Sequence, residues 1–292
     1  MTTILGIDAA WTAAQPSGVA LIQRHYGRWR CLAAAPSYPS FELLARAVAC
    51  DWSQGGEAGQ ADVGRLIAAA EHLAGESLGV AAVDMPVSTA DITGRRAADR
   101  EVSRRFGSRG CSTHSPSPLR PGQLGAALAQ QFMVAGFDMA TTATAPGTPR
   151  RLVEVYPHPA LLALLGRDMR VPYKVSKSCS YWPGARIEVR IARLLAEFEA
   201  ILDGLAVHID GISVPLPRPQ DVETLSSLKR YEDAIDALVC CWVGSQYLDG
   251  LAVALGDETA AIWCPRSRCE RFLCSLACRG SRNPVTRTHH AD

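Results

Sequence analysis

The sequence predicts an α/β protein with a mixed sheet, in which an antiparallel meander continues into parallel strands and helices flank the sheet. Three observations support this prediction. Strand-like runs at 3–11, 19–22 and 28–32 follow one another across short polar turns, as in a meander. The run at 78–84 is wholly apolar up to its final acid, which is typical of a strand buried on both faces. Stretches with helical spacing alternate with the later strands, which indicates helices layered on a sheet.

The remaining elements follow from apolar spacing and from residues that begin or end helices. His158 and Pro159 open a helix after the strand at 151–157. The stretches at 54–60 and 108–121, rich in Gly, Ser or Pro, are expected to be loops. Helices are expected at 41–50, 62–74, 94–106, 122–137, 186–202 and around 231–239, and a last strand at 260–263.

Composition and charge limit the classes of function. Of 292 residues, 48% are hydrophobic and 20% charged, so the chain can bury a core. The formal net charge of +1 gives no overall attraction for nucleic acid, and any basic surface must be local. No uncharged apolar run reaches the ~20 residues that cross a bilayer, and no basic-then-apolar segment precedes the first strand. We therefore expect a cytoplasmic protein that does not enter a membrane.

One domain is expected over 1–265, with 94–150 as a helical and loop insertion, followed by a poorly ordered Arg- and Cys-rich tail at 266–292. Structural zinc sites favour paired C-x2-C ligands, and the tail cysteines are spaced more loosely. An unstructured tail is therefore favoured over a zinc site. The cysteines concerned are Cys264, Cys269, Cys274 and Cys278.

The most informative stretch is the helix-like segment around 231–239. Asp233 and Asp236 are three residues apart, so they project from one side of a helix as neighbours. Two half-buried carboxylates repel each other unless a cation or a raised pKa relieves them. The alternative is a solvated first turn, where acids suit the helix dipole.

Further acids favour the first interpretation. Asp8 ends the first strand, Asp84 follows the apolar strand, and Glu154 lies within a third. Charged residues beside buried strands need partners, and several converging carboxylates suit Mg²⁺ or Mn²⁺. Two such ions can activate water and stabilise the leaving oxygen of a phosphodiester. The acids therefore predict a two-metal phosphodiesterase.

An Asp on the first strand of a meander, a second acid after a later strand and an Asp pair on the last helix resemble the ribonuclease H-like fold, with a layout similar to Holliday-junction resolvases. The chain also resembles, from about residue 3 to 265, the bacterial "domain of unknown function" family 429, described as predicted ribonuclease H-like nucleases. The segments that carry this resemblance are Gly6-Ile7-Asp8, Val83-Asp84-Met85-Pro86, Arg95-Arg96 through Asp99-Arg100, Ser112-Thr113-His114-Ser115-Pro116, Glu154-Val155-Tyr156-Pro157 and Glu232-Asp233-Ala234-Ile235-Asp236-Ala237.

The resemblance implies a ribonuclease H-like domain and a nuclease that uses two divalent ions. It implies Asp8, Asp84 and Asp236 as metal ligands, with Asp233 or Glu154 completing the set. Alternatively, Glu154 has a structural role and binds an arginine of the basic helix expected at 94–106.

Basic residues supply candidate substrate contacts. Arg96, Arg100 and Arg104 recur at spacings of four and could bind a phosphate backbone, although Asp99 and Glu101 neutralise part of that helix. Lys174 could contact phosphate or simply be solvated. His114 could move protons near the metals or stabilise its loop, and His158, beside two prolines, is expected to be structural.

Two other functions remain open. One is a non-catalytic scaffold that keeps the fold and binds nucleic acid or protein. The other is an actin-like nucleotide-binding phosphotransferase, which needs Gly-rich phosphate loops after the acidic strands. Ala9-Ala10 follows Asp8 and Met85-Pro86 follows Asp84, so this second alternative is disfavoured. The sequence does not indicate whether a nucleic-acid partner is DNA or RNA, or the oligomeric state.

Overall fold

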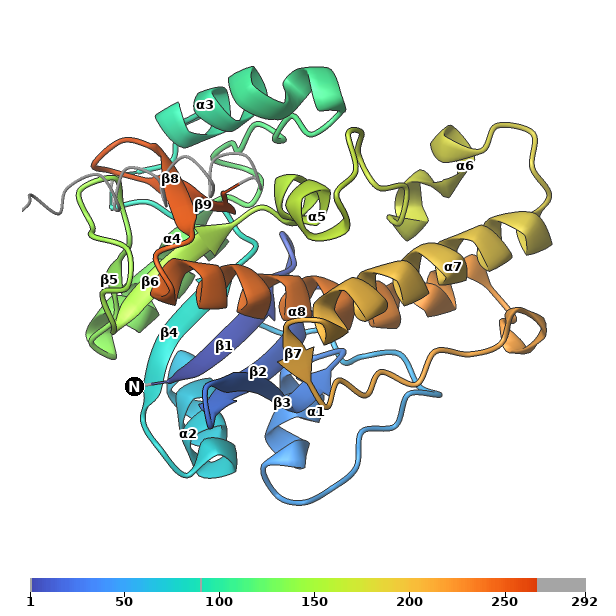
Figure 1. Cartoon of the computed structure of the whole chain (residues 1–292), viewed down its shortest axis with the longest axis horizontal. Coiled ribbons are helices and arrows are strands. Elements are labelled where there is room, and N and C mark those ends of the chain that lie inside the picture. The colour runs from blue at the N-terminus through green and yellow to red at the C-terminus, as the bar shows by residue number, and fades with distance from the viewer. Residues whose placement is uncertain (1, 90, 267–292) are drawn as a thin grey trace, which may run out of the picture.

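A computed structural model describes residues 2–89 and 91–266. Within them the chain forms a mixed α/β fold around one nine-stranded sheet (Figure 1). The strand order is β7-β3-β2-β1-β4-β6-β9-β8, and β5 pairs with β6 beside this path. The strands are β1 (Thr3–Asp8), β2 (Gly18–His25), β3 (Arg28–Ala35), β4 (Leu78–Val83), β5 (Asp138–Met139), β6 (Arg151–Val155), β7 (Ile209–Asp210), β8 (Ala252–Gly256) and β9 (Ala261–Pro265).

The pairing confirms the predicted mixture of an antiparallel meander and parallel strands. β1 pairs antiparallel with β2, with Asp8 opposite Gly18, and β2 pairs antiparallel with β3. On its other side β1 is parallel to β4, and β4 is parallel to β6. The carboxyl ends of β1, β4 and β6 therefore lie at one edge of the sheet.

Helices cover both faces of the sheet (Figure 1). Successive strand residues point to opposite faces, so Ile4 and Leu5 of β1 belong to the cores on the two different faces. One face packs against α5 (Pro157–Leu165), α7 (Ile187–Ala206) and α8 (Lys229–Leu248). The other packs against α1 (Tyr38–Leu44), α2 (Val63–Ala74) and α4 (Gln123–Val134). A smaller cluster joins α3 (Ala97–Phe106) to β8 and β9.

Helix α8 makes the closest approach to the sheet. A Cβ atom added to Gly6 would lie 2.1 Å from the backbone oxygen of Ala237, and one added to Gly18 would lie 2.0 Å from that of Asp233. Side chains at these two strand positions would therefore push the helix away. The two glycines let the helix backbone rest directly on β1 and β2.

Most boundaries agree with the expectations from sequence, with a few corrections. Asp62 caps α2 and Gly75 ends it in the left-handed conformation, as the spacing predicts. The first helix ends at Leu44 rather than near residue 50, and the chain turns with Ala47 at a φ of 58°. The short strands β5, β7 and β8 were not predicted, because two-residue and partly exposed strands carry little apolar periodicity.

No helix in the described residues is long and apolar enough to cross a membrane. The expectations for the tail, including the zinc alternative, concern residues that lie almost wholly outside the described part, which ends at Arg266.

We predict that Gly18→Ala lowers the free energy of unfolding by about 3 kcal/mol or more, because the new methyl group meets helix backbone that has no room to move. Urea unfolding followed by circular dichroism measures this. Gly59→Ala is the matched control, since nothing lies within 4 Å of its added Cβ. A Gly18→Ala protein as stable as the control would contradict the close packing of α8.

Candidate functional site

A cleft of about 770 Å³ opens at the edge of the sheet where β1 and β4 end. Its volume is in the range of small-ligand sites. The first half of α8 forms one side of it. Acids line this side, and they are Asp8, Asp84, Glu232 and Asp233.

Each acid is placed by a different part of the fold. Asp8 is the last residue of β1, and Asp84 directly follows β4, where its N–H donates to the carbonyl of Ile7 at 2.8 Å. Asp233 and Asp236 lie on α8 and are 2% and 0% exposed. This burial excludes the solvated-turn interpretation of the aspartate pair. The structure thus gathers Asp8, Asp84, Asp233 and Asp236, which lie far apart in sequence.

Two lysines contact the acids of α8. The ammonium group of Lys174 donates to Asp236 and lies 3.3 Å from Glu232. Lys229 binds Asp233 and lies 3.0 Å from Glu232. Lys174, predicted as a phosphate contact or a solvated residue, is instead paired with carboxylates.

Further hydrogen bonds fix the same acids. The hydroxyl of Tyr173 donates to Asp236 at 2.6 Å, and the N–H of Val175 donates to Glu232 at 2.6 Å. Both donors flank Lys174. The segment after α5 is thereby held against α8 by one polar network.

Carboxyl groups outnumber the lysines that pair with them. Five acids (Asp8, Asp84, Glu232, Asp233 and Asp236) face two lysines (Lys174 and Lys229), which gives a formal charge of −3 when all seven groups are charged. Burial raises the pKa of Asp84, and the Asp8 carboxylate raises it further. Burial also raises the pKa of Asp236, to about 6, although Lys174 opposes this. Burial raises the pKa of Asp233 too, with Lys229 opposing.

The lysines stay charged in this environment. Burial disfavours the ammonium of Lys174, but Asp236 and the other acidic groups around it together outweigh burial and raise its pKa. Lys174 and Lys229 in turn lower the pKa of Glu232 against the effect of its burial. Glu232 is therefore the ionised partner of both lysines.

Whether the acids can hold a cation depends on their arrangement, their free oxygen atoms and their charge. Among residues 2–89 and 91–266, no three Asp, Glu, His or Cys side chains are arranged as ready metal ligands. Asp233 Oδ2, however, is buried and has no hydrogen-bond partner, so one carboxylate oxygen is left for a cation. The hard oxygen donors and the excess negative charge suit Mg²⁺ or Mn²⁺. The residues therefore fit a divalent ion that shares these acids with the lysines.

Basic residues line the rest of the cleft. They come from the loop after α3 and from the segment after α5, and they are His114, Arg120, Arg170 and Lys177. His114 lies edge-on to Trp11, with ring centroids 6.4 Å apart. Burial lowers the pKa of His114, and Lys177, Arg170 and Arg120 lower it further, so the imidazole favours its neutral form.

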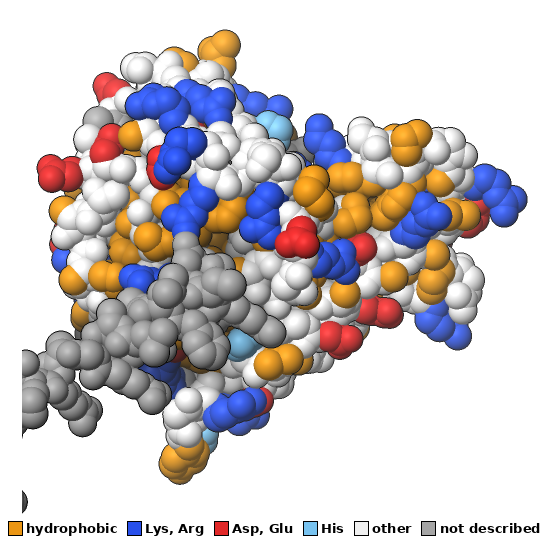
Figure 2. Space-filling model, turned by 45° about the horizontal axis from the view of Figure 1, so that its top comes forward, with side chains coloured by type: hydrophobic (Ala, Val, Ile, Leu, Met, Phe, Trp, Pro, Cys, Tyr) orange, Lys and Arg blue, Asp and Glu red, His pale blue; other side chains and the backbone are white. Residues whose placement is uncertain are grey.

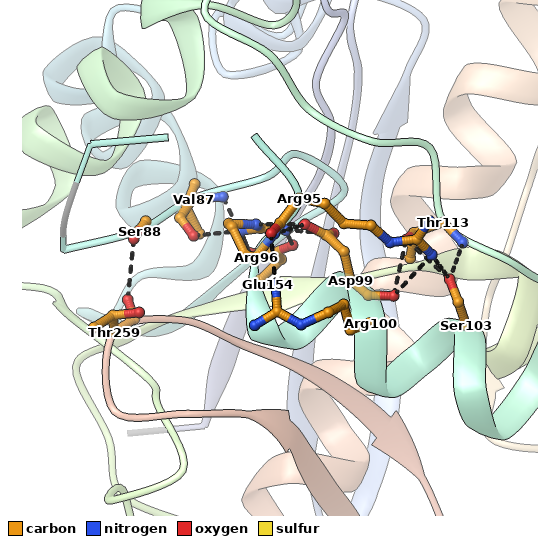
Figure 3. A network of polar contacts seen from close by, with 10 residues as sticks. All are labelled: Val87, Ser88, Arg95, Arg96, Asp99, Arg100, Ser103, Thr113, Glu154 and Thr259. Carbon is orange, nitrogen blue, oxygen red and sulfur yellow. Dashed lines mark hydrogen bonds and ion pairs between the residues drawn. The ribbon is translucent and has the colours of Figure 1, made fainter. Parts of the chain in front are cut away.

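Glu154 lies at the end of β6 but points away from the lysine-bound acids. Its carboxylate accepts from both terminal nitrogens of Arg96, at 2.7 and 2.6 Å, and from the N–H of Val87 at 3.0 Å (Figure 3). The Arg96 and Glu154 side chains are 8% and 4% exposed. Glu154 thus holds an arginine at the start of the basic helix, which is the structural role weighed above.

The basic helix does not present its three arginines as one phosphate-binding face. All five N–H groups of Arg96 are used, on Glu154, Asp99 and the carbonyl of Val87. Arg96 is therefore part of the interior, and its predicted role as a substrate contact has no N–H group left to serve it. Arg104 pairs with Glu101, and Arg100 donates to a backbone carbonyl, so both have local partners. Neither lines the cleft, although basic side chains gather on the α3 side of the surface (Figure 2).

The structure adds site residues that sequence reasoning missed. Lys229 stands four residues before Asp233, and this helical ion-pair spacing could have revealed it. Glu232, to which the sequence assigned no role of its own, is the common partner of the lysines. No sequence pattern marks Arg170 or Tyr173, because loops after α5 bring them to the site.

Comparison with known proteins identifies the family. The model of the family described as "Protein of unknown function (DUF429)" matches residues 6–260. The chain belongs to the DUF429 family. The searches of curated proteins and of solved structures each returned no match.

For this DUF429 protein we predict that Asp84→Asn raises the free energy of unfolding in EDTA at pH 8. The folded-state pKa of Asp84 is raised, so its charge destabilises the fold above that pKa. Each unit of such a shift is worth about 1.4 kcal/mol. The gain should shrink as the pH falls towards 4, because the wild-type carboxyl takes up its proton. Urea unfolding at several pH values measures both effects, and a destabilised variant at pH 8 would contradict the charge excess.

We predict that Glu154→Gln destabilises this DUF429 protein by about 3 kcal/mol and changes Mn²⁺ affinity less than about threefold. The substitution removes one charge of a buried ion pair, which is strongly destabilising. Glu101→Gln is the matched control at an exposed Arg104 pair and should cost less than about 1 kcal/mol. Unfolding and calorimetric Mn²⁺ titration measure the two quantities. Normal stability with lost Mn²⁺ binding would make Glu154 a ligand instead.

Proposed function

We propose that the protein is a nuclease of ribonuclease H-like fold that hydrolyses phosphodiester bonds of nucleic acid with two Mg²⁺ or Mn²⁺ ions. The fold part of this proposal is supported by the strand order β3-β2-β1-β4-β6, with an antiparallel meander and then parallel strands. An acid at the end of β1, another after β4 and a pair on α8 occupy the positions expected from the sequence resemblance.

The observation that carries the proposal is the convergence of Asp8, Asp84 and Asp233 on one cleft, with Asp236 buried close behind them. These four aspartates would hold the ions, and the unpartnered oxygen of Asp233 is available to one of them. The ions would supply an activated water and stabilise the leaving oxygen. Their charge would also offset the burial and the repulsion by Asp8 that raise the pKa of Asp84.

Other residues of the chain have roles that follow from their contacts. Lys174 and Lys229 hold the acids of α8 in place and favour their ionised forms against the effect of burial. Neutral His114 can accept a proton at the cleft. The aromatic rings of Trp11 and Tyr156 line the same cleft and can exclude water from bound substrate.

The two alternative functions, a scaffold and a phosphotransferase, would need different features at the site. A scaffold without catalysis has no use for buried, repelling carboxylates, which cost stability. An actin-like phosphotransferase needs glycine-rich phosphate loops, and Ala9-Ala10 and Met85-Pro86 stand at those places. Both alternatives remain as outcomes of the experiment below.

We predict that the wild-type protein binds Mn²⁺ and cleaves single-stranded oligonucleotides in its presence. Asp8→Asn should weaken Mn²⁺ binding by about tenfold or more and slow cleavage by about a hundredfold or more. Its circular dichroism should be unchanged, because Asp8 lies half-buried at a strand end. Calorimetric titration and a gel cleavage assay measure these effects.

The control is Asp203→Asn, an exposed aspartate on α7 that should behave as wild type. Wild-type protein that binds no Mn²⁺ and cleaves nothing would overturn the proposal. Salt-dependent binding of oligonucleotide without cleavage would then identify the scaffold alternative, since phosphate contacts release counterions.

A further inference from the structure

The cleft is lined by groups of opposite charge. Besides the acids, Arg120, Arg170 and Lys177 line it; these cations gather around His114, whose pKa they lower, and form the cationic side of the cleft. Within the described residues, these three cations make no ion pair with a carboxylate, whereas Lys174 and Lys229 do. A cluster of cations that the protein itself does not neutralise suits an anion from outside.

Two basic residues that line the cleft each have a buried nitrogen atom without a hydrogen-bond partner. His158 is 4% exposed and lines the cleft, and its Nδ1 atom is buried with no hydrogen-bond partner. Arg170 Nε is likewise buried and unpartnered. Leaving such groups unpaired costs roughly 1–3 kcal/mol each, and a bound group can recover that cost.

The backbone adds to this positive environment. His158 lies in the first turn of α5, a nine-residue helix whose N-terminus meets the cleft at Pro157. Helix N-termini carry partial positive charge and free N–H groups, which favour phosphate. Guanidinium groups such as that of Arg170 match phosphate geometry through paired hydrogen bonds.

We propose that this cationic side, formed by Arg120, Arg170, Lys177 and His158, seats a second phosphate of the substrate, next to the phosphodiester held at the acids. The inference rests on the proposed nuclease function for its choice of substrate. It narrows the substrate to a single strand that carries a phosphate adjacent to the scissile bond. That phosphate comes either from the interior of a strand or from a phosphorylated end.

The size and lining of the cleft favour a short segment of single strand. A volume of about 770 Å³ lies in the range of small-ligand sites, so the cleft admits a few nucleotides rather than a duplex. Trp11 and Tyr156 line it and offer aromatic faces for base stacking. With a net charge of +1, the chain has a local phosphate seat but no excess charge to attract a long duplex.

The first test measures phosphate binding to the cationic side in the absence of catalysis. Inorganic phosphate is titrated calorimetrically into the full chain in EDTA. We expect Arg170→Ala and, separately, Lys177→Ala to weaken phosphate binding by about tenfold, the effect of losing about 1.4 kcal/mol. Arg28→Ala, an exposed arginine bound to Asp210 at the far edge of the sheet, should bind as wild type. Lys177 is exposed, so its variant remains informative if Arg170→Ala does not fold.

The second test uses cleavage of thymidine oligonucleotides with Mn²⁺. The substrates are TpT, the 5′-phosphorylated dinucleotide pTpT and the trinucleotide TpTpT. We expect kcat/KM for pTpT to exceed that for TpT by about tenfold, through KM, and the ratio to fall towards one in both variants. TpTpT cleaved as well as pTpT would identify an internal phosphate as sufficient, whereas a preference for pTpT alone would identify a strand end.

The outcomes separate the two proposals. If phosphate binding depends on Arg170 and Lys177 but no oligonucleotide is cleaved, the nuclease function fails and the phosphate seat stands. If oligonucleotides are cleaved but phosphate binding and the pTpT preference are unchanged in both variants, the proposal of a second phosphate-binding site is overturned. Wild-type protein that does not bind phosphate also overturns it.

Discussion

Helix α8 lies so close to the first hairpin that neither Gly6 nor Gly18 has room for a side chain. Gly18 faces Asp8 across the hairpin and touches the backbone of Asp233. One contact therefore sets the distance between the acid of β1 and the acids of α8. The rest of the site depends on it, because the lysines and the cleft are arranged around those acids.

The site that this contact creates is electrostatically unfavourable. Buried carboxylates outnumber the lysines that pair with them, and the pKa values of Asp84, Asp233 and Asp236 are raised. Repulsion of this kind opposes folding and is retained where a site serves a function. A divalent ion would relieve it, which connects the excess of carboxyl groups with the proposed chemistry.

A second buried network supports the site from the side. Arg96 joins Glu154 at the end of β6 to the start of α3 and to Val87, in the segment that follows Asp84 (Figure 3). The loop after α3 carries His114 and Arg120 into the cleft. Glu154 thus contributes to the cationic side by fixing the chain that supplies it. Together the two networks give a cleft with an acidic and a basic side, which matches the proposed substrate with two phosphates.

The sequence by itself determined the sheet class, the main helices and the aspartates, because apolar periodicity and acids at strand ends are local signals. It also marked Glu154 and Arg96 without deciding their roles. Only the tertiary structure decided that these two bind each other, that Lys174 and Lys229 pair with the acids, and that Arg170 and His158 face the same cleft. The physical reason is that charge pairing and desolvation depend on contacts between residues far apart in the chain, which no local spacing encodes.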